Sequence, residues 1–372
     1  MTRIGFAYNR KPQPDSPLAD AARRDDRSAP GASRVPDDDT QGAAVAMPVD
    51  ADDEFAEWDT PETIGAVADA LGVLGTVIHL EADGDFPSRL RHERPDIVFN
   101  IAEGMNGPNR EAHVPAICEF YGIPYTASDP FTLSLCLDKA RTKEALLAHR
   151  VRTAAWVVVR SETDFVRAEK KLEFPVFAKP LHEGSSKGIT ERNFCRTPIE
   201  LREVGAFLLE RYAEPVLVEE YLPGDEFTCA VMGNGRDAHV LPIIQMNFTV
   251  LPEGALPIYG FEAKWVWDTP DRPLDLYECP AAIPTRLTRA IEKVTLDAYR
   301  ATGCRDWARI DVRLDAAAAP HVVEINPLPG ILPKPEDNSC FPTAARAAGM
   351  NYDQLIQRCL VLAAQRTGVT LA

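Results

Sequence analysis

The chain has 372 residues, 45% of them hydrophobic, which is enough for two or three globular domains with substantial cores. Its formal net charge of −16 argues against nucleic acid or an anionic membrane as a partner, because both bind basic surfaces. The N-terminal stretch MTRIGFAYNR has no long apolar region, no segment is long and apolar enough to cross a membrane, and the eight cysteines lack metal-binding spacing. We therefore expect a cytoplasmic protein with reduced thiols.

The first third of the chain alternates strands and helices. Strands are expected over 3–8, 76–80 and 96–100, and helices over 61–74 and 111–121. Thr60 suits a helix cap and Pro61 suits a first helical turn. The alternation predicts a parallel sheet with crossover helices. Residues 10–53 are rich in Pro, Asp, Ala and Arg without periodicity, so we expect a disordered insertion there.

The remaining two thirds continue the alternation of strands and helices. Strands are expected over 156–159, 176–179, 216–219, 227–232 and 240–245. Helices are expected over 129–149, 163–172, 199–212, 284–302 and 352–365. Gly233-Asn234-Gly235 is typical of a tight hairpin turn.

The most informative stretch is a predicted strand pair over 307–314 and 321–325. Apolar Ile310 and Val312 alternate with polar Arg309 and Asp311, which gives one buried face and one polar face. The second strand delivers oxygen ligands, so that Asp311, Glu324 and Asn326 together suit Mg²⁺, which takes such oxygens along with substrate phosphates. An ordinary hairpin with a salt-bridged polar face is the alternative.

Four further groups favour a nucleotide. Lys179 ends a strand and is followed by the loop HEGSSKG, whose amides and hydroxyls suit phosphates, although an ordinary turn explains the loop alone. The stretch EEYLPGDE (219–226) is a hinge suited to a base and a ribose, or else a solvated strand end. Lys139 and Lys143 share a helix face, which alone is typical of a solvated surface, and Lys264 lies among aromatic residues, where an isolated lysine more often only packs its stem on the rings. Together they form one coherent Mg·ATP site.

Several ordered blocks resemble the D-alanine–D-alanine ligase family of the ATP-grasp superfamily. They include DIVFNIAEG, LDKARTK, FAKPLHEGSSKGI, LVEEYLPGDEFT, WARIDVRLD and EINPLPG. The resemblance covers nearly the whole chain outside the insertion. It implies a mixed α/β, three-domain fold in which ATP lies between two antiparallel sheets. The expected domains are an N-terminal parallel α/β domain at 1–137, a central domain at 138–224 and a C-terminal domain at 225–372.

The resemblance also implies the roles of single residues. The residues expected to bind ATP are Lys139, Lys179, Ser185, Ser186, Glu219, Leu222, Glu226 and Lys264. The expected metal ligands are Asp311, Glu324 and Asn326. The expected catalytic groups are Arg309, Ser185, Lys264 and the backbone of Gly330. The expected substrate contacts are Glu103, Arg110, Trp265 and Ser339.

The implied activity joins two amino acids by a peptide bond. A carboxylate is a poor electrophile, and phosphoryl transfer from ATP converts it into an acyl phosphate that an amine can attack. The implied cofactors are ATP and two Mg²⁺ ions, with Mn²⁺ as a possible substitute. The implied partners are amino-acid or peptide substrates and a second copy of the chain in a homodimer. The segment 245–261 is the expected lid.

The amino-acid half of the site departs from the family pattern. The usual Gly-rich turn and glutamate after the first strand are replaced by Asn9-Arg10-Lys11-Pro12 and the insertion, so Glu57 or Asp59 is a candidate for the substrate ammonium. Arg110 and Lys334 are candidates for an extra substrate carboxylate, or are simple surface charges. Three functions therefore remain open: a D-alanine–D-alanine ligase, a related ligase for another amino acid or peptide, and a non-catalytic ATP-binding protein.

Overall fold

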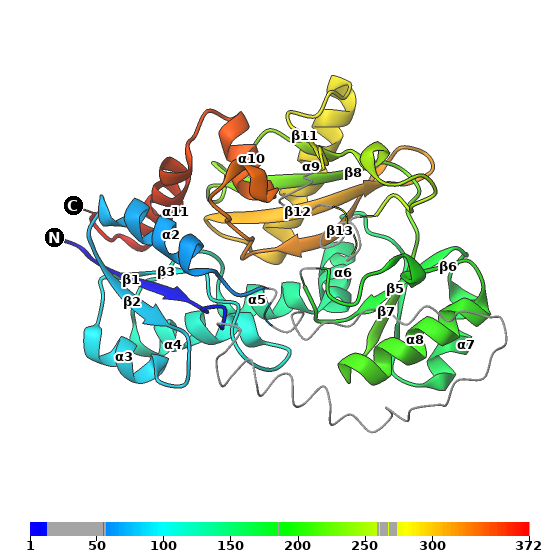
Figure 1. The fold of residues 1–372 in the computed structure, drawn as a ribbon, viewed down its shortest axis with the longest axis horizontal. Helices are drawn as coiled ribbons and strands as arrows, with labels where there is room; N and C mark the ends of the chain where they lie inside the picture. Colours follow the sequence, from blue (N-terminus) through cyan, green and yellow to red (C-terminus); the bar gives the residue numbers. More distant parts are fainter. Residues whose placement is uncertain are drawn as a thin grey trace.

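The computed structural model describes residues 1–12, 55, 57–184, 186–258, 260, 267 and 274–371. Most of the expected insertion, and Ser185, Lys264 and Trp265, lie outside the described residues. The described helices include none that combines the length and apolar character needed to span a bilayer. Figure 1 shows the described chain arranged around three separate sheets.

The N-terminal sheet is parallel, as the alternation predicts. Its strands, in the order β2-β1-β3, are β1 (Arg3–Tyr8), β2 (Thr76–Glu81) and β3 (Ile97–Asn100). Its helices are α2 (Pro61–Gly72), α3 (Phe86–Glu93) and α4 (His113–Tyr121), which follows the 3-10 helix η1 (Arg110–Ala112). Thr60 caps α2 by accepting a hydrogen bond from the Thr63 amide. The sequence did not predict α3, because only Phe86 and Leu90 of this helix are buried and two residues carry little periodicity.

The second sheet is antiparallel, with strand order β4-β7-β5-β6. Its strands are β4 (Trp156–Val159), β5 (Val176–Pro180), β6 (Phe194–Cys195) and β7 (Val216–Glu220). Its helices are α7 (Glu162–Lys171), α8 (Pro198–Tyr212) and the 3-10 helix η2 (Glu191–Asn193). The apolar side chains of both long helices and of the strands make one core cluster.

The third sheet is also antiparallel, in the order β11-β10-β8-β12-β13, with β9 paired to β8. Its strands are β8 (Glu226–Met232), β9 (His239–Val240), β10 (Ile244–Met246), β11 (Tyr277–Glu278), β12 (Trp307–Leu314) and β13 (Pro320–Asn326). The accompanying helices are α9 (Thr285–Thr302), α10 (Cys340–Ala347), α11 (Tyr352–Thr367), η3 (Phe248–Val250) and η5 (Pro335–Asp337). The single strand expected over 240–245 is wrong: Pro242, which has no N–H for a ladder, lies between β9 and β10.

The single helix expected over 129–149 is also wrong. The chain forms α5 (Pro130–Leu137) and α6 (Lys139–Ala148), separated by Asp138 in an extended conformation with ψ 98°. The Asp138 carboxylate accepts hydrogen bonds from the amides of Ala140 and Arg141, which starts a new helix. In Figure 1, α6 lies between the second and third sheets. Ala140 packs on the second sheet through Leu217, and Leu146 joins the core of the third.

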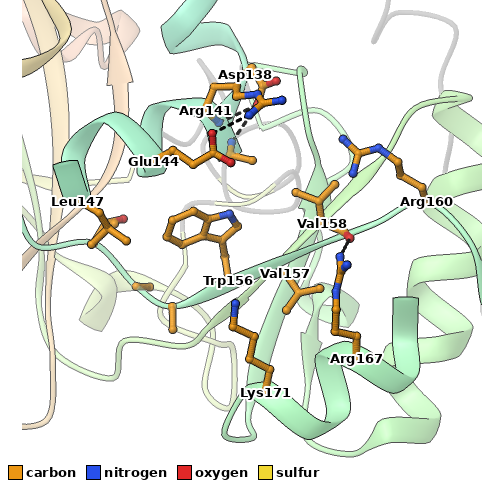
Figure 2. A pocket seen from close by; sticks show the side chains of 14 residues that line it. Asp138, Arg141, Glu144, Leu147, Trp156, Val157, Val158, Arg160, Arg167 and Lys171 are labelled. Atoms are coloured by element: carbon orange, nitrogen blue, oxygen red, sulfur yellow. Dashed lines mark hydrogen bonds and ion pairs between the residues drawn. The ribbon is translucent and has the colours of Figure 1, made fainter. Parts of the chain in front are cut away.

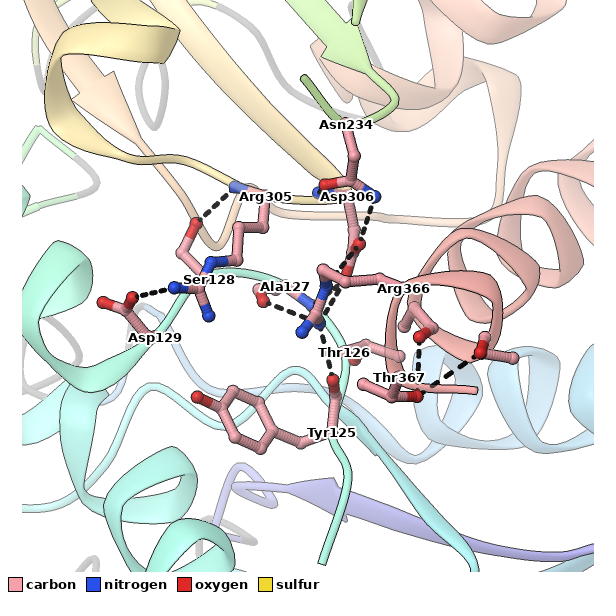
Figure 3. A network of polar contacts seen from close by, with 12 residues as sticks. Tyr125, Thr126, Ala127, Ser128, Asp129, Asn234, Arg305, Asp306, Arg366 and Thr367 are labelled. Carbon is pink, nitrogen blue, oxygen red and sulfur yellow. Dashed lines mark hydrogen bonds and ion pairs between the residues drawn. The ribbon is translucent and has the colours of Figure 1, made fainter. Parts of the chain in front are cut away.

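A buried ion pair joins the N-terminal sheet, the third sheet and the last helix (Figure 3). Asp306, which is fully buried, accepts two hydrogen bonds from Arg366 of α11, at 2.8 and 3.0 Å. The same carboxylate accepts from the Ala127 amide and from the Asn234 side chain. Arg366 also donates to the Tyr125 carbonyl at 2.9 Å. Because Asp306 directly precedes β12, this network fixes the strand that carries the polar residues of the site.

Candidate active site

A cavity of about 830 Å³ lies between the two antiparallel sheets and collects most of the predicted residues. The predicted residues that line it are Glu103, Lys139, Lys179, Ser186, Glu219, Leu222, Glu226, Arg309, Asp311, Glu324, Asn326, Gly330 and Ser339. Their positions span more than two hundred residues of sequence, so the fold alone brings them together. Ser185, Lys264 and Trp265 lie outside the described residues.

The hairpin β12–β13 supplies the polar floor of the cavity. Asp311 lies opposite Glu324 across the ladder, and Arg309 lies opposite Asn326. The Arg309 guanidinium donates to Asp311 Oδ2 at 3.0 Å, and the Thr228 hydroxyl donates to Asp311 Oδ1 at 2.9 Å. The apolar face of the same strand is buried, as the alternation predicts.

This donor set fits Mg²⁺. Asp311 and Glu324 contribute carboxylates and Asn326 an amide, all oxygen ligands, and Mg²⁺ is commonly held by one or two carboxylates while phosphates and water complete its shell. Burial raises the pKa of Asp311, Arg309 opposes that rise and the nearby Glu324 carboxylate adds to it. Two carboxylates at opposed positions of neighbouring strands form a site that favours a cation.

A pair of lysines approaches the floor from the second sheet and from α6. The Lys139 ammonium lies 3.1 Å from Glu324, and the Lys179 ammonium lies 2.7 Å from Glu219. Lys143 holds the other oxygen of Glu219 at 2.6 Å and also donates to the Thr153 hydroxyl. Burial alone raises the pKa of Glu219, but the two ammonium groups lower it to about 2. Lys143 is a residue of the site to which the sequence assigned no role beyond its helical spacing from Lys139.

Replacing Glu219 by glutamine is expected to lower the free energy of unfolding by about 3–5 kcal/mol at pH 7, because two buried ammonium groups lose their partner. A carboxylate whose folded pKa lies near 2 stabilises the fold above its unfolded pKa of 4.5. That contribution, about 3 kcal/mol, is lost as the pH falls from about 4.5 to about 2. Urea unfolding at several pH values measures this contribution.

Glu220→Gln, a change at the next residue, is the control and should change the free energy of unfolding by less than about 1 kcal/mol. If Glu219→Gln loses as much stability as the wild type when the pH falls from about 4.5 to about 2, the account is contradicted.

The connection between β7 and β8 forms the hinge predicted for the base and ribose. Gly224 packs directly on Leu314, where a Cβ atom would approach the Leu314 Cβ to 2.6 Å, so this position requires glycine. The Leu222 carbonyl and the Glu226 carboxylate both face Arg313, which donates to each at 2.7 Å. Sequence reasoning assigned Arg313 no role, although its alternation with Arg309 and Asp311 put it on the same polar face.

The far end of the cavity is rich in acidic side chains, and Arg110 lies behind them. Arg110 is not among the residues that line the cavity, and its guanidinium lies 3.0 Å from Glu57 and 3.7 Å from Glu183. Glu57 also pairs with Lys187 at 3.2 Å, so it is a poor candidate for a substrate ammonium. Glu57 approaches Gly184 so closely that a Cβ atom there would lie 2.3 Å from its carboxylate. Lys334, the other candidate, pairs with exposed Glu62 at 2.9 Å.

Three acids at this end differ from Glu57. Asp59, Glu103 and Glu111 line the cavity, and among the described residues none of their side chains has an ion pair. Burial raises the pKa of Asp59 to about 8. Burial, together with the charge of Glu57, raises the pKa of Glu111 to about 8. Burial and the neighbouring Glu111 raise the pKa of Glu103 in the same way. At pH 7 these raised pKa values favour the neutral acids, and a cationic group bound beside them would lower the pKa values and stabilise the carboxylates.

The loop after β13 provides candidate groups for an oxyanion. Gly330 lines the cavity and is exposed, and its carbonyl accepts a hydrogen bond from the Ser339 hydroxyl at 3.1 Å. The Ser339 hydroxyl also accepts a hydrogen bond from the Leu332 amide, so this side chain stabilises the loop as well as facing the cavity. Arg309 Nε is buried without a hydrogen-bond partner among the described residues. A buried donor without a partner is costly and suits a group that is charged only during a reaction.

A second cavity, of about 630 Å³, lies on the outer side of α6 and β4 (Figure 2). It is lined by Trp156, Leu147 and several exposed charged side chains that pair locally. Arg141 pairs with Glu144 at 2.7 Å, and Arg167 donates to the Val158 carbonyl at 2.8 Å. None of the predicted site residues lines it. The first cavity is therefore the candidate active site.

Comparison with known proteins identifies the family. The family model for the D-ala D-ala ligase C-terminus matches residues 148–361. A D-alanine–D-alanine ligase from Bordetella avium is 36% identical over 258 residues, covering 69% of this chain and 75% of that protein. The chain belongs to the D-alanine–D-alanine ligase family. The uncharacterized protein y4sG of Sinorhizobium fredii is 35% identical to this ligase over 271 residues, covering 73% of this chain and 75% of that one.

Solved structures confirm the ATP-grasp fold of the ligase. A D-alanine–D-alanine ligase from Bacillus anthracis complexed with ATP superposes with a TM-score of 0.65 at 19% identity, covering 99% of both chains. The VanG D-Ala:D-Ser ligase from Enterococcus faecalis superposes with a TM-score of 0.64 at 18% identity, covering 97% of this chain and 99% of that one. The predicted fold class is thus confirmed, and the ligase is an ATP-dependent enzyme that forms C–N bonds.

Proposed function

We propose that this ligase joins the carboxylate of one amino acid to the amine of a second through an acyl phosphate, with release of ADP and phosphate. The observation that carries the proposal is the wall formed by Arg309, Asp311 and Glu324, which faces Lys139 and Lys179 across one cavity. Phosphoryl transfer depends mainly on positioning and on neutralising charge, and this wall supplies both without a protein nucleophile.

ATP binds along the hinge in this proposal. The backbone near Leu222 meets the base, Glu226 accepts from ribose hydroxyls, and Lys139 and Lys179 hold phosphate oxygens. Asp311, Glu324 and Asn326 hold Mg²⁺, which when bound neutralises phosphate charge. Lys139 pairs with Glu324 in the structure, so its ammonium exchanges a carboxylate partner for a phosphate when nucleotide arrives. The proposal includes two Mg²⁺ ions. It also places Lys264 at the γ-phosphate, and Ser185 and Ser186 in the loop that contacts the phosphates.

Attack by the amine creates an oxyanion at the acyl carbon. Arg309 and the Gly330 amide are the donors proposed to stabilise it, because both line the cavity beside the metal ligands. Ser339 is proposed to hold the carboxylate of the second substrate, and Trp265 to contact the first. The domain boundaries near 137 and 224, a homodimer and a cytoplasmic location are parts of the same proposal.

The identity of the amino acids has two candidates. The names of several relatives favour D-alanine for both substrates. The second candidate is a ligase for another amino acid or peptide, and the acidic side chains of Asp59, Glu103 and Glu111, which have no ion-pair partner among the described residues, favour it. A cationic group stabilises the charged form of a buried acid beside it, so a substrate with a cationic group besides its α-ammonium suits this end better than the methyl of alanine.

Phosphate release from Mg·ATP tests the proposal, with mass spectrometry of the product. The purified ligase is given D-alanine, then a panel of D- and L-amino acids that pairs each diamino acid with its uncharged isostere. We expect amino-acid-dependent release and a dipeptide of the corresponding mass. Turnover with D-alanine alone would select the first candidate, and preference for a diamino acid the second. Bound ATP with no release for any member of the panel would contradict both.

A further inference from the structure

Arg313 holds together parts of the nucleotide end that are distant in sequence. Its side chain points from β12 into the cavity wall, and the residue is only 6% exposed. Its Nε donates to the Leu222 carbonyl at 2.7 Å, and its Nη1 donates to the Glu226 carboxylate at 2.7 Å. Its Nη2 donates to the Tyr221 hydroxyl at 2.7 Å and to the Pro257 carbonyl at 2.9 Å.

These acceptors belong to separate segments of the chain. Leu222 and Tyr221 lie in the hinge, and Pro257 lies in the segment 247–258, the part of the expected lid that follows β10. The guanidinium carbon also lies 4.8 Å from the ring centre of Tyr221 and 6.0 Å from that of Phe248. At its other side, the segment is held to η2 by a hydrogen bond of 2.7 Å from the Leu256 amide to Glu191. The segment 247–258 thus bridges the two antiparallel sheets, and Arg313 is its anchor on the third sheet.

We propose that Arg313 is a positioning residue that couples ribose recognition by Glu226 to the placement of the segment 247–258 over the nucleotide. The proposal rests on the proposed role of Glu226 at the ribose. Arg313 holds Glu226 Oε2, which leaves the other carboxylate oxygen to accept a ribose hydroxyl in a fixed direction. The same guanidinium holds Pro257, so a movement of Glu226 on nucleotide binding is transmitted to the segment.

The planar fork of arginine is essential to this arrangement. Each of its three nitrogens donates to a different backbone or side-chain group, and two of these bonds run to carbonyls that no other described side chain contacts. A lysine carries the charge on a single atom and cannot reach the hinge, Glu226 and Pro257 together. Arg313→Lys therefore separates the charge of the residue from its geometry.

Binding measurements with modified nucleotides test the recognition half of the proposal. The Kd of ATP, 2′-deoxy-ATP and 3′-deoxy-ATP is measured for the wild type, Arg313→Met, Arg313→Lys and the exposed control Arg286→Met. The wild type and the control should prefer ATP over at least one deoxy form by about tenfold, the size expected for a hydrogen bond to a charged group. In Arg313→Met and Arg313→Lys that preference should fall to about one- to threefold. Equal weakening of all three nucleotides would overturn the proposal, because a merely structural role has that effect.

Limited proteolysis tests the coupling half. In the wild type, ATP should slow cleavage within residues 247–258 by about tenfold, and the less favoured deoxy form should protect less, because its ribose lacks a contact to Glu226. In both Arg313 variants, ATP at saturation should protect this segment no better than the deoxy form does. ATP protection that still exceeds the protection by the deoxy form in a folded Arg313→Lys would overturn the proposal. Both assays measure nucleotide binding and need no turnover. If the wild type binds ATP but releases no phosphate with any amino acid, the proposed function is contradicted, and these two assays still decide the role of Arg313.

Discussion

Replacing Glu324 by glutamine is expected to lower amino-acid-dependent phosphate release by at least about a thousandfold in a protein that still folds. Glu324 faces Asp311 across the β12–β13 ladder and is one of only two carboxylates in the proposed metal set. Neutralising it removes a hard anionic ligand, and metal-ion stabilisation of a phosphoryl-transfer transition state is worth several kcal/mol, or about a thousandfold in rate. The amide remains a similar size, so packing around β13 is kept.

The control for this variant is Glu278→Gln, an exposed acid of β11 in the same sheet. It should change turnover by less than about twofold, because an exposed surface substitution away from the site has little effect. Raising the Mg²⁺ concentration should recover part of the activity of Glu324→Gln. The control Glu278→Gln should need no additional Mg²⁺ for full activity. Full activity of Glu324→Gln at low Mg²⁺ would show that Glu324 holds no metal and would contradict the proposed site.

Replacing Arg309 by methionine is expected to lower the turnover number by about a hundred- to a thousandfold, the cost typical of losing one oxyanion donor. Arg309 lines the cavity beside Asp311 and keeps a buried Nε hydrogen without a partner among the described residues. Its interaction with an oxyanion exists only in the transition state, so the Kd of ATP should change by less than about threefold. Single-turnover phosphate release and an ATP titration measure the two quantities.

Arg309→Lys keeps a positive charge next to Asp311. Its turnover number should exceed that of Arg309→Met by less than about tenfold, because a lysine does not reproduce the guanidinium geometry. Arg286→Met, on the exposed first turn of α9, is the matched control and should behave as the wild type. A large rise in the Kd of ATP with an unchanged turnover number at saturation would assign Arg309 to ground-state binding instead.

The parts of the fold that the sequence predicted well are those in which a residue pattern acts over short range. The alternation of Arg309, Ile310, Asp311 and Val312 predicted both the strand and its polar face, because side chains of a strand alternate between faces. Thr60 and Pro61 predicted the start of α2 within one residue. The resemblance then predicted which of the dispersed polar residues meet in one cavity, and all those within the described residues line it except Arg110.

The failures have physical reasons as well. Asp138 interrupts an apparently continuous helix, because a carboxylate can either sit on a helix surface or cap a new one, and local sequence does not distinguish them. The ion pair between Arg110 and Glu57 was not predicted, because the two residues are 53 positions apart along the chain. Arg313 was missed for a similar reason, since its contacts with Leu222, Glu226 and Pro257 all join distant segments. Long-range ion pairs have no signature in a single sequence.

The most direct test of the central claim is transfer of oxygen-18 from the carboxylate of the first amino acid to inorganic phosphate during turnover. An acyl phosphate forms by attack of that carboxylate on the γ-phosphorus, so its bridging oxygen leaves with phosphate when the amine attacks carbon. The account predicts one labelled oxygen per phosphate released, together with a dipeptide that has lost one label. Phosphate that carries label only from labelled water would show that the enzyme hydrolyses ATP without activating a carboxylate, and would contradict the account.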